Sequence, residues 1–203
     1  MATTQFLFAG FGGQGILFSG KFLAYKGLME EKQVSWLPSY GPEMRGGTAS
    51  CSVIISDTPV GSPIVSKPDV LVAMNLPSLD KYEDSVVSGG TIYVDSTLIE
   101  RKVKRDDVTV HYIPATGLAN ENGMPTLANM IIVGKILGEM NQFNADGINA
   151  ALGFVGTVLT LQNPAEIPES NGRLSGGAGF RDDAQGKILS FQQFQQFVVM
   201  PGA

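Results

Sequence analysis

The stretch TQFLFAGFGGQGILFSGKFLAYKGLM, at residues 4–29, decides the fold of this chain. Its first part, residues 4–10, is a short apolar run of strand length that ends in glycine, and residues 16–29 carry apolar residues at helical spacing. Between them lies a G-x-G-x-x-G pattern made by Gly10, Gly12 and Gly15. We therefore predict a strand, a glycine turn and a helix, the context in which this pattern has a physical meaning.

The rest of the sequence continues this alternation of strands and helices. Short apolar or alternating runs predict further strands at 33–38, 48–55, 69–75, 91–96 and 108–114. Helices are predicted at 77–87, at 125–140 and at 145–152. We expect an α/β fold of three layers, a Rossmann-like and mostly parallel sheet with helices on both faces, in which residues 48–55 form an antiparallel member.

The length, charge and hydrophobic pattern of the chain limit the classes of function that it can have. The chain has 203 residues, enough for one α/β domain with a sizeable core. Its net charge of −5 comes from interspersed acidic and basic residues, so we expect no binding to nucleic acid or to a membrane. The start, MATTQFLFAG, lacks a cationic region and a cleavable apolar stretch, and no apolar run approaches the roughly 20 residues of a bilayer span. We expect a cytoplasmic location.

Cys51 and His111 are the only cysteine and the only histidine of the sequence. One of each excludes a disulfide, a zinc site and an iron–sulfur cluster held within this chain. No cluster of candidate general bases accompanies them. We therefore predict no catalytic residue and no metal ligand in this chain.

The glycine turn is the first candidate binding site. Gly12, Gly13, Gln14 and Gly15 would let backbone N–H groups and the helix N-terminus approach a phosphate without a side chain in the way. The alternative is that the glycines merely allow a tight turn. A nicotinamide-binding fold would also need an acidic residue at the end of the second strand, and residues 36–38 are Trp-Leu-Pro. A dehydrogenase is therefore the weaker interpretation.

A second glycine-rich loop, SYGPEMRGG at 39–47, carries more polar chemistry than a connector needs. Arg45 can present a planar fork to a phosphate or a carboxylate, with Gly46 and Gly47 supplying N–H groups and Tyr40 in the same loop. The alternative pairs Arg45 with the nearby glutamate or with a neighbouring subunit. Either interpretation puts the loop at an interface or at the edge of a ligand site.

Asn75 is at the carboxyl end of the predicted strand 69–75, where open α/β sheets bind ligands. It is therefore a further candidate for the same site. The alternative, which the general preferences of Asn and Ser for helix starts favour, is that Asn75 or Ser78 caps the next helix.

Four segments, in this order, closely resemble the γ subunit, or γ domain, of 2-oxoacid:ferredoxin oxidoreductases. They are FAGFGGQGI at 8–16, LPSYGPEMRGGTASCSVIIS at 37–56, GSPIVSKPDVLVAMNLPSLDKY at 61–82 and PTLANMIIVGKILG at 125–138. The resemblance gives a γ domain at 1–155 and an atypical C-terminal extension at 156–203. The extension departs from the family, whose γ subunits usually finish with a charged helix.

The resemblance implies a multisubunit enzyme that oxidatively decarboxylates a 2-oxoacid, passes electrons through iron–sulfur clusters to ferredoxin, and transfers the acyl group to coenzyme A. In such families thiamine diphosphate lies between α and β partners, and the cluster cysteines lie mainly in a ferredoxin-like δ partner and in β. The γ domain helps to engage coenzyme A, which implies a role at its phosphates for the backbone of residues 12–15 and for Arg45. The family also implies a homodimer through the γ domain.

The resemblance does not select one 2-oxoacid as the substrate. The segment at 37–56 is more similar to the 2-oxoglutarate and 2-ketoisovalerate groups than to the pyruvate group. A freestanding Rossmann-like nucleotide-binding protein and a ligand-free scaffold are the alternatives to a γ subunit. The scaffold differs from the subunit only in whether the glycine loops hold coenzyme A.

Overall fold

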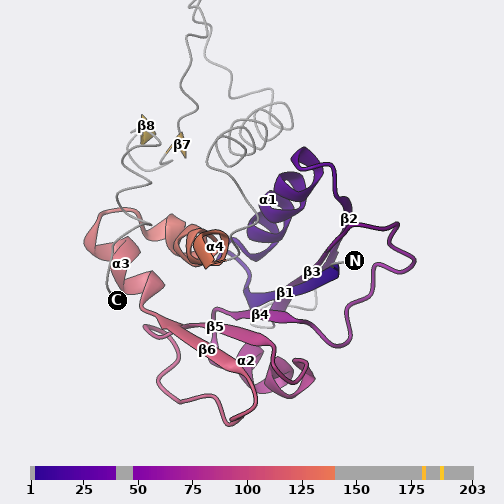
Figure 1. The fold of residues 1–203 in the computed structure, drawn as a ribbon. Coiled ribbons are helices and arrows are strands. Elements are labelled where there is room, and N and C mark those ends of the chain that lie inside the picture. The colour runs from indigo at the N-terminus through magenta and orange to yellow at the C-terminus, as the bar shows by residue number, and fades with distance from the viewer. Residues whose placement is uncertain (1–2, 40–47, 140–179, 182–187, 190–203) are drawn as a thin grey trace, which may run out of the picture.

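The computed structural model describes residues 3–39, 48–139, 180–181 and 188–189. Figure 1 shows the arrangement of the helices and strands in these ranges. The strands are β1 (Thr3–Phe11), β2 (Gln33–Ser39), β3 (Thr48–Ser56), β4 (Val70–Ala73), β5 (Thr91–Asp95), β6 (Thr109–Ile113), β7 (Phe180–Arg181) and β8 (Ile188–Leu189). The helices are α1 (Ile16–Met29), α2 (Leu76–Tyr82), α3 (Ala115–Glu121) and α4 (Ala128–Glu139), with 3-10 turns η2 (Glu83–Ser85) and η3 (Pro125–Leu127).

The main sheet has six strands in the order β2-β3-β1-β4-β5-β6. β4 pairs in parallel with β1 and β5, and β5 pairs in parallel with β6. β3 is antiparallel to both of its neighbours, β1 and β2, so it alone runs against the other strands. The sequence-based expectation of a mostly parallel sheet with an antiparallel strand at 48–55 is confirmed.

Helices cover both faces of the sheet, as Figure 1 shows. On one face, Phe6 and Phe8 of β1 belong to a core cluster with buried residues of α1 and α4. On the other face, Leu7 of β1 and Leu71 of β4 pack in a second cluster with Leu79 of α2. The chain therefore leaves β1 toward one face and β4 toward the other. Such a change of direction between neighbouring parallel strands opens a crevice at their carboxyl ends.

Close packing of α1 on the sheet requires glycine. A Cβ atom added to Gly20 would lie 2.3 Å from the Sγ of Cys51, and one added to Gly27 would lie 2.9 Å from Val34. Cys51 is fully buried beneath the helix, and loss of contact with water raises the pKa of its thiol to about 12. It packs as a small apolar residue, because a thiol with this pKa stays protonated at neutral pH.

Three elements differ from the sequence-based expectation. The helix expected at 77–87 ends at Tyr82 and continues only as the 3-10 turn η2. The helix expected from Pro125 begins as the turn η3 before α4. Helix α3 was not predicted, because it has only seven residues, and its apolar side is formed by two alanines, Ala115 and Ala119, and the partly buried Leu118. The helix expected at 145–152 lies outside the described residues.

Two kinds of feature are absent from the described residues, a membrane-spanning helix and a metal-binding cluster. No helix in these ranges is long and apolar enough to cross a membrane. Within the same ranges, no group of three or more His, Cys, Asp or Glu side chains is arranged to hold a metal ion.

Candidate functional site

The candidate site lies where β1 and β4 end side by side. The N–H of Met74 donates to the carbonyl of Ala9, 2.9 Å away, so the two strands stay paired up to the turn that follows each. The glycine turn leaves β1, and Asn75 follows β4. Five of the predicted site residues therefore meet at the carboxyl edge of the sheet: Gly12, Gly13, Gln14, Gly15 and Asn75.

Two glycines of the turn have backbone conformations that favour glycine. The φ angle is +91° at Gly13 and +73° at Gly15, the left-handed region that other residues rarely adopt. Gly13 is exposed, and a Cβ atom placed on it would have no neighbour within 4 Å among the described residues. In the part of the chain that the structure describes, no atom therefore covers the outer side of the turn.

The electrostatics of this open side favour an anion. Gly15 is the N-cap residue of α1, a helix of 14 residues with no acidic side chain in its first turn. The partial positive charge of the helix N-terminus is therefore not neutralised by the helix's own residues. Unsatisfied N–H groups at such a position bind phosphates and carboxylates readily.

The side chain of Gln14 has a structural role that the sequence did not reveal. Its Nε2 donates to the carbonyl of Met74, 2.9 Å away, and its Oε1 accepts from the N–H of Phe11 at 2.6 Å. Gln14 thus ties the end of β1 to the end of β4. Gly10 leaves space for this bridge, because a Cβ atom there would lie 2.7 Å from Oε1 of Gln14.

Asn129 of α4 fixes the turn from the face covered by α1 and α4. Its Nδ2 donates to the carbonyl of Gly15, 3.3 Å away, and to the Oγ of Ser19, 3.0 Å away. Sequence reasoning missed this residue, since it is separated from Gly15 by more than half of the chain and belongs to an apolar helical segment. A buried asparagine within such a segment was the available signal.

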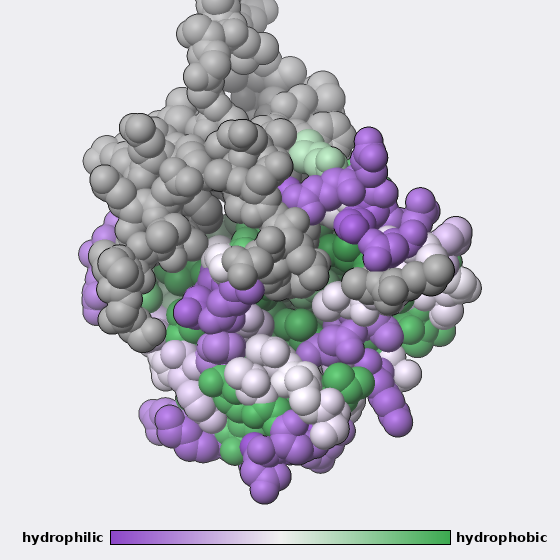
Figure 2. Space-filling model, viewed as in Figure 1, coloured by the Kyte–Doolittle hydropathy of each residue, from purple (hydrophilic) through white to green (hydrophobic). Residues whose placement is uncertain are grey.

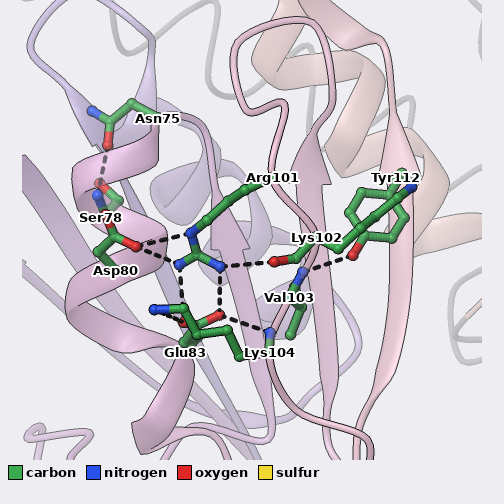
Figure 3. A network of polar contacts seen from close by, with 9 residues as sticks. All are labelled: Asn75, Ser78, Asp80, Glu83, Arg101, Lys102, Val103, Lys104 and Tyr112. Carbon is green, nitrogen blue, oxygen red and sulfur yellow. Dashed lines mark hydrogen bonds and ion pairs between the residues drawn. The ribbon is translucent and has the colours of Figure 1, made fainter.

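Asn75 combines the two roles that its sequence position allowed. Its Oδ1 accepts from the N–H of Ser78 at 2.8 Å and caps α2, as Figure 3 shows. Among the described residues its Nδ2 is buried without a hydrogen-bond partner, and so is the Oγ of Ser78. A buried amide group without a partner is costly, so a ligand acceptor or an ordered water that reached this atom would be stabilising. The capping interpretation is confirmed, and ligand binding by Asn75 stays a prediction.

Helix α2 is held in place by the ion pairs in Figure 3. The guanidinium of Arg101 contacts both carboxylate oxygens of Glu83 at 2.9 and 3.0 Å. It also pairs with Asp80 of α2. Glu83 is buried, and its hydrogen bonds to Arg101 raise the pKa of the guanidinium above its ordinary value. The arrangement fixes the end of α2 and η2 against the loop that follows β5.

The surface near the site carries exposed apolar side chains. Phe11 at the end of β1, Leu76 at the start of α2 and Leu98 after β5 are exposed. The face drawn in Figure 2 shows hydrophobic groups as separate areas among hydrophilic ones. The apolar residues of this edge could contact the uncharged part of a ligand, whereas the glycine turn offers hydrogen-bond donors.

Four predicted site residues lie outside the described residues: Tyr40, Arg45, Gly46 and Gly47. The described residues on either side of this segment are at the candidate edge. Thr48 pairs with Phe11, and Ser39 pairs with Ser50. Whether Arg45 contributes a cation to the site therefore stays a prediction.

The sequence matches a known family. Residues 5–155 match the model of the pyruvate ferredoxin/flavodoxin oxidoreductase family. The chain belongs to this family. The resemblance that the four sequence segments indicated is thereby confirmed.

Members of the oxidoreductase family from archaea are similar in sequence. The ketoisovalerate oxidoreductase subunit VorA of Methanothermobacter thermautotrophicus is 46% identical over 129 residues, which are 64% of this chain and 27% of that protein. The 2-oxoglutarate synthase subunit KorC of Methanocaldococcus jannaschii is 37% identical over 147 residues, 71% of this chain and 79% of that protein. The chain therefore spans about a quarter of the ketoisovalerate relatives and most of KorC.

Solved structures of the oxidoreductase family share the fold. The γ subunit of a keto/oxoacid ferredoxin oxidoreductase from Geobacter sulfurreducens aligns with a TM-score of 0.66 and 26% identity, over 83% of this chain and 87% of that chain. A 2-oxoglutarate:ferredoxin oxidoreductase from Magnetococcus marinus, solved with 2-oxoglutarate, coenzyme A and succinyl-CoA bound, aligns with a TM-score of 0.68 and 22% identity, over 83% of this chain and 28% of that chain.

Proposed function

We propose that this chain is the γ subunit of a 2-oxoacid:ferredoxin oxidoreductase and that its glycine turn binds coenzyme A. The observation that carries the proposal is the exposed glycine turn at the N-terminus of α1. The turn follows β1 and lies beside the end of β4, where the chain leaves the two strands toward opposite faces of the sheet. A phosphate of coenzyme A accepts hydrogen bonds from the backbone N–H groups at Gly12 and Gly13 and interacts with the positive end of α1.

The donor set of the site fits coenzyme A in two further respects. Coenzyme A carries amide carbonyls besides its phosphates, and the buried Nδ2 of Asn75 is a donor without a partner. Phe11 and Leu76 offer exposed apolar surface beside the turn for its uncharged arm. Arg45, together with Gly46, Gly47 and Tyr40, completes the proposed set as a source of positive charge and further N–H groups.

The reaction itself belongs to partner subunits in this proposal. Thiamine diphosphate, bound between α and β partners, supplies the decarboxylation chemistry, and iron–sulfur clusters on β and a ferredoxin-like δ partner carry the electrons. This chain has a single cysteine, which is buried and protonated, and so lacks the thiolates that a cluster needs. It contributes assembly surface, including a homodimer contact, and the coenzyme A site.

The proposed substrate is 2-oxoglutarate or 2-ketoisovalerate. The names of the similar archaeal subunits support both: ketoisovalerate oxidoreductase and 2-oxoglutarate synthase subunits are up to 46% and 37% identical, whereas the pyruvate synthase subunits PorC are 26% and 29% identical. The side chain of the oxoacid is recognised near thiamine diphosphate, on the partner subunits. The proposed location of the complex is the cytoplasm.

The test compares two glycine substitutions in the complex purified from the native host through a tag on this chain. Gly13→Asp puts a carboxylate into the open turn, where it repels a phosphate. Gly89→Asp is the matched control, because Gly89 also has a positive φ, +77°, and open space around it, but lies before β5 at the opposite edge of the sheet. Aspartate tolerates the left-handed conformation better than most residues, so the strain is similar at both positions.

We expect Gly13→Asp to raise the KM for coenzyme A roughly tenfold, because the new carboxylate repels the phosphate at short range. The assay is viologen reduction with 2-oxoglutarate or 2-ketoisovalerate. The KM for the oxoacid should not change, and Gly89→Asp should behave as wild type. Equal KM values for coenzyme A in all three complexes would reject the binding role and leave a scaffold. A chain that purifies without partners and binds a nucleotide would favour the freestanding alternative.

A further inference from the structure

We propose that Asn129 is a positioning residue, which holds the glycine turn in the conformation that binds the anion. The inference rests on the proposed function, because it concerns the same turn. It adds a residue on a distant element, α4, that touches no ligand and acts through Gly15.

The first argument is the unusual place of Asn129 in α4. It is 4% exposed and is the sole buried polar side chain among the described residues of that helix. Its neighbours Met130, Ile131, Ile132 and Val133 are buried and apolar. Burying an amide among them is costly unless it is hydrogen-bonded, and asparagine is a poor helix former. Packing alone would favour leucine or alanine at this position.

The second argument is that the donor atom of Asn129 is directed at the turn. Nδ2 is 3.3 Å from the carbonyl of Gly15 and 3.0 Å from the Oγ of Ser19, which itself donates to the same carbonyl at 3.1 Å. The N–H of Ser19 also donates to it, at 2.9 Å. The carbonyl of Gly15 is therefore held by three donors from two helices.

The geometry of the peptide bond carries this restraint to the binding surface. In a planar trans peptide the C=O and the following N–H point in opposite directions. Fixing the carbonyl of Gly15 toward Ser19 and Asn129 therefore fixes the N–H of Ile16 outward from the helix N-terminus. The first N–H groups of a helix have no acceptor within the helix, so this donor is available to an anion.

The third argument is the close contact between the two residues. A Cβ atom on Gly15 would lie 2.5 Å from Nδ2 of Asn129, so the amide packs directly against the backbone of the turn. The left-handed conformation of Gly15, with φ +73°, places its carbonyl within reach. Asn129 and a glycine at position 15 are thus mutually dependent.

The test is Asn129→Leu in the purified complex, which keeps the size of the side chain and removes its donor. Asn122→Leu is the matched control: its Nδ2 also donates to a backbone carbonyl, that of Leu118 at 2.9 Å, but Asn122 is exposed at the end of α3. Two quantities are measured, the KM for coenzyme A at saturating oxoacid and the Kd for coenzyme A by calorimetry without oxoacid.

We expect Asn129→Leu to raise both quantities roughly tenfold, while kcat at saturating coenzyme A stays within about twofold of wild type. Asn122→Leu should leave both unchanged. Ser19→Ala should give a smaller rise, because Asn129 keeps its bond to Gly15 when the Oγ of Ser19 is removed.

Each alternative outcome overturns either the inference on Asn129 or the binding role of the glycine turn. If Asn129→Leu lowers the thermal midpoint but leaves KM and Kd unchanged while Gly13→Asp raises them, Asn129 is structural and this inference is wrong. If neither variant changes them, the binding role of the turn is wrong as well. If Asn129→Leu does not assemble, Ser19→Ala decides: unchanged KM and Kd in that variant overturn the inference.

Discussion

Glycine residues in α1 and α4 have opposite surroundings, so the same substitution should have opposite effects on stability. A methyl group on Gly20 would lie 2.3 Å from the buried Sγ of Cys51, whereas one on Gly138 would meet no described residue within 4 Å. We expect Gly20→Ala to lower the free energy of unfolding by about 1–3 kcal/mol. Gly138→Ala should raise it by about 0.5–1 kcal/mol, because alanine restricts the unfolded chain and favours the helix. Urea denaturation of the purified chain measures both.

A double variant identifies the clash as the cause. Cys51→Ala removes the sulfur atom that the new methyl group meets, so Gly20→Ala should cost less in that background. Additive effects of the two substitutions would mean that Gly20 is required for another reason.

At the scale of single residues, the sequence predicts positions better than side-chain partners. The glycines at 12, 13 and 15 were assigned to the turn from local spacing, and the structure has them there. The bridge from Gln14 to Met74 and the contact of Asn129 with Gly15 join residues that are 60 and 114 positions apart. Such contacts exist only once the sheet and its helices have assembled, so local patterns carry no trace of them.

At the scale of elements, the attachment of α2 and η2 depends on one arginine more than on a neighbouring lysine. Arg101 contacts both oxygens of Glu83, whose side chain is 3% exposed. Nζ of Lys104 lies 3.9 Å from the same carboxylate, but the lysine side chain is 71% exposed. Arg101 and Lys104 therefore allow a buried and an exposed ion pair to be compared on the same carboxylate, that of Glu83.

We expect Arg101→Ala to lower the free energy of unfolding by about 2–4 kcal/mol, because it leaves the buried carboxylate of Glu83 without its main partner. Lys104→Ala should lower it by less than about 0.5 kcal/mol, as is usual for exposed ion pairs. Chemical denaturation of the two variants beside wild type measures the difference. Similar losses in both would show that solvent reaches Glu83.

Elements with strong periodicity were predictable, and those without it were not. The alternating residues of TASCSVII indicated an antiparallel strand, and β3 is the strand that runs against the others. The fully buried residues of helix α3 are alanines, with Leu118 partly buried beside them, and its sequence contains Gly117 within the helical segment. Tertiary contact with α4 outweighs these weak local preferences, which is why a sequence-based assignment passed over it.

At the scale of the whole molecule, the mostly parallel sheet separates the two parts of the proposed reaction. The carboxyl ends of β1 and β4 supply N–H donors, a helix N-terminus and a spare amide, all suited to holding a ligand. In the proposed function this edge holds a phosphate-bearing molecule, and the bond breaking at the oxoacid belongs to the partner subunits.

This separation predicts how the complex selects its substrate. If the oxoacid pocket lies on partner subunits, substitutions in the glycine turn change the response to coenzyme A and leave the choice of oxoacid untouched. We expect the ratio of kcat/KM for 2-oxoglutarate to that for 2-ketoisovalerate, measured at saturating coenzyme A, to be equal within about twofold in wild type, Gly13→Asp and Gly89→Asp complexes. A ratio that shifts only in Gly13→Asp would put the oxoacid side chain against this chain, because the control carries the same new charge at the opposite edge of the sheet.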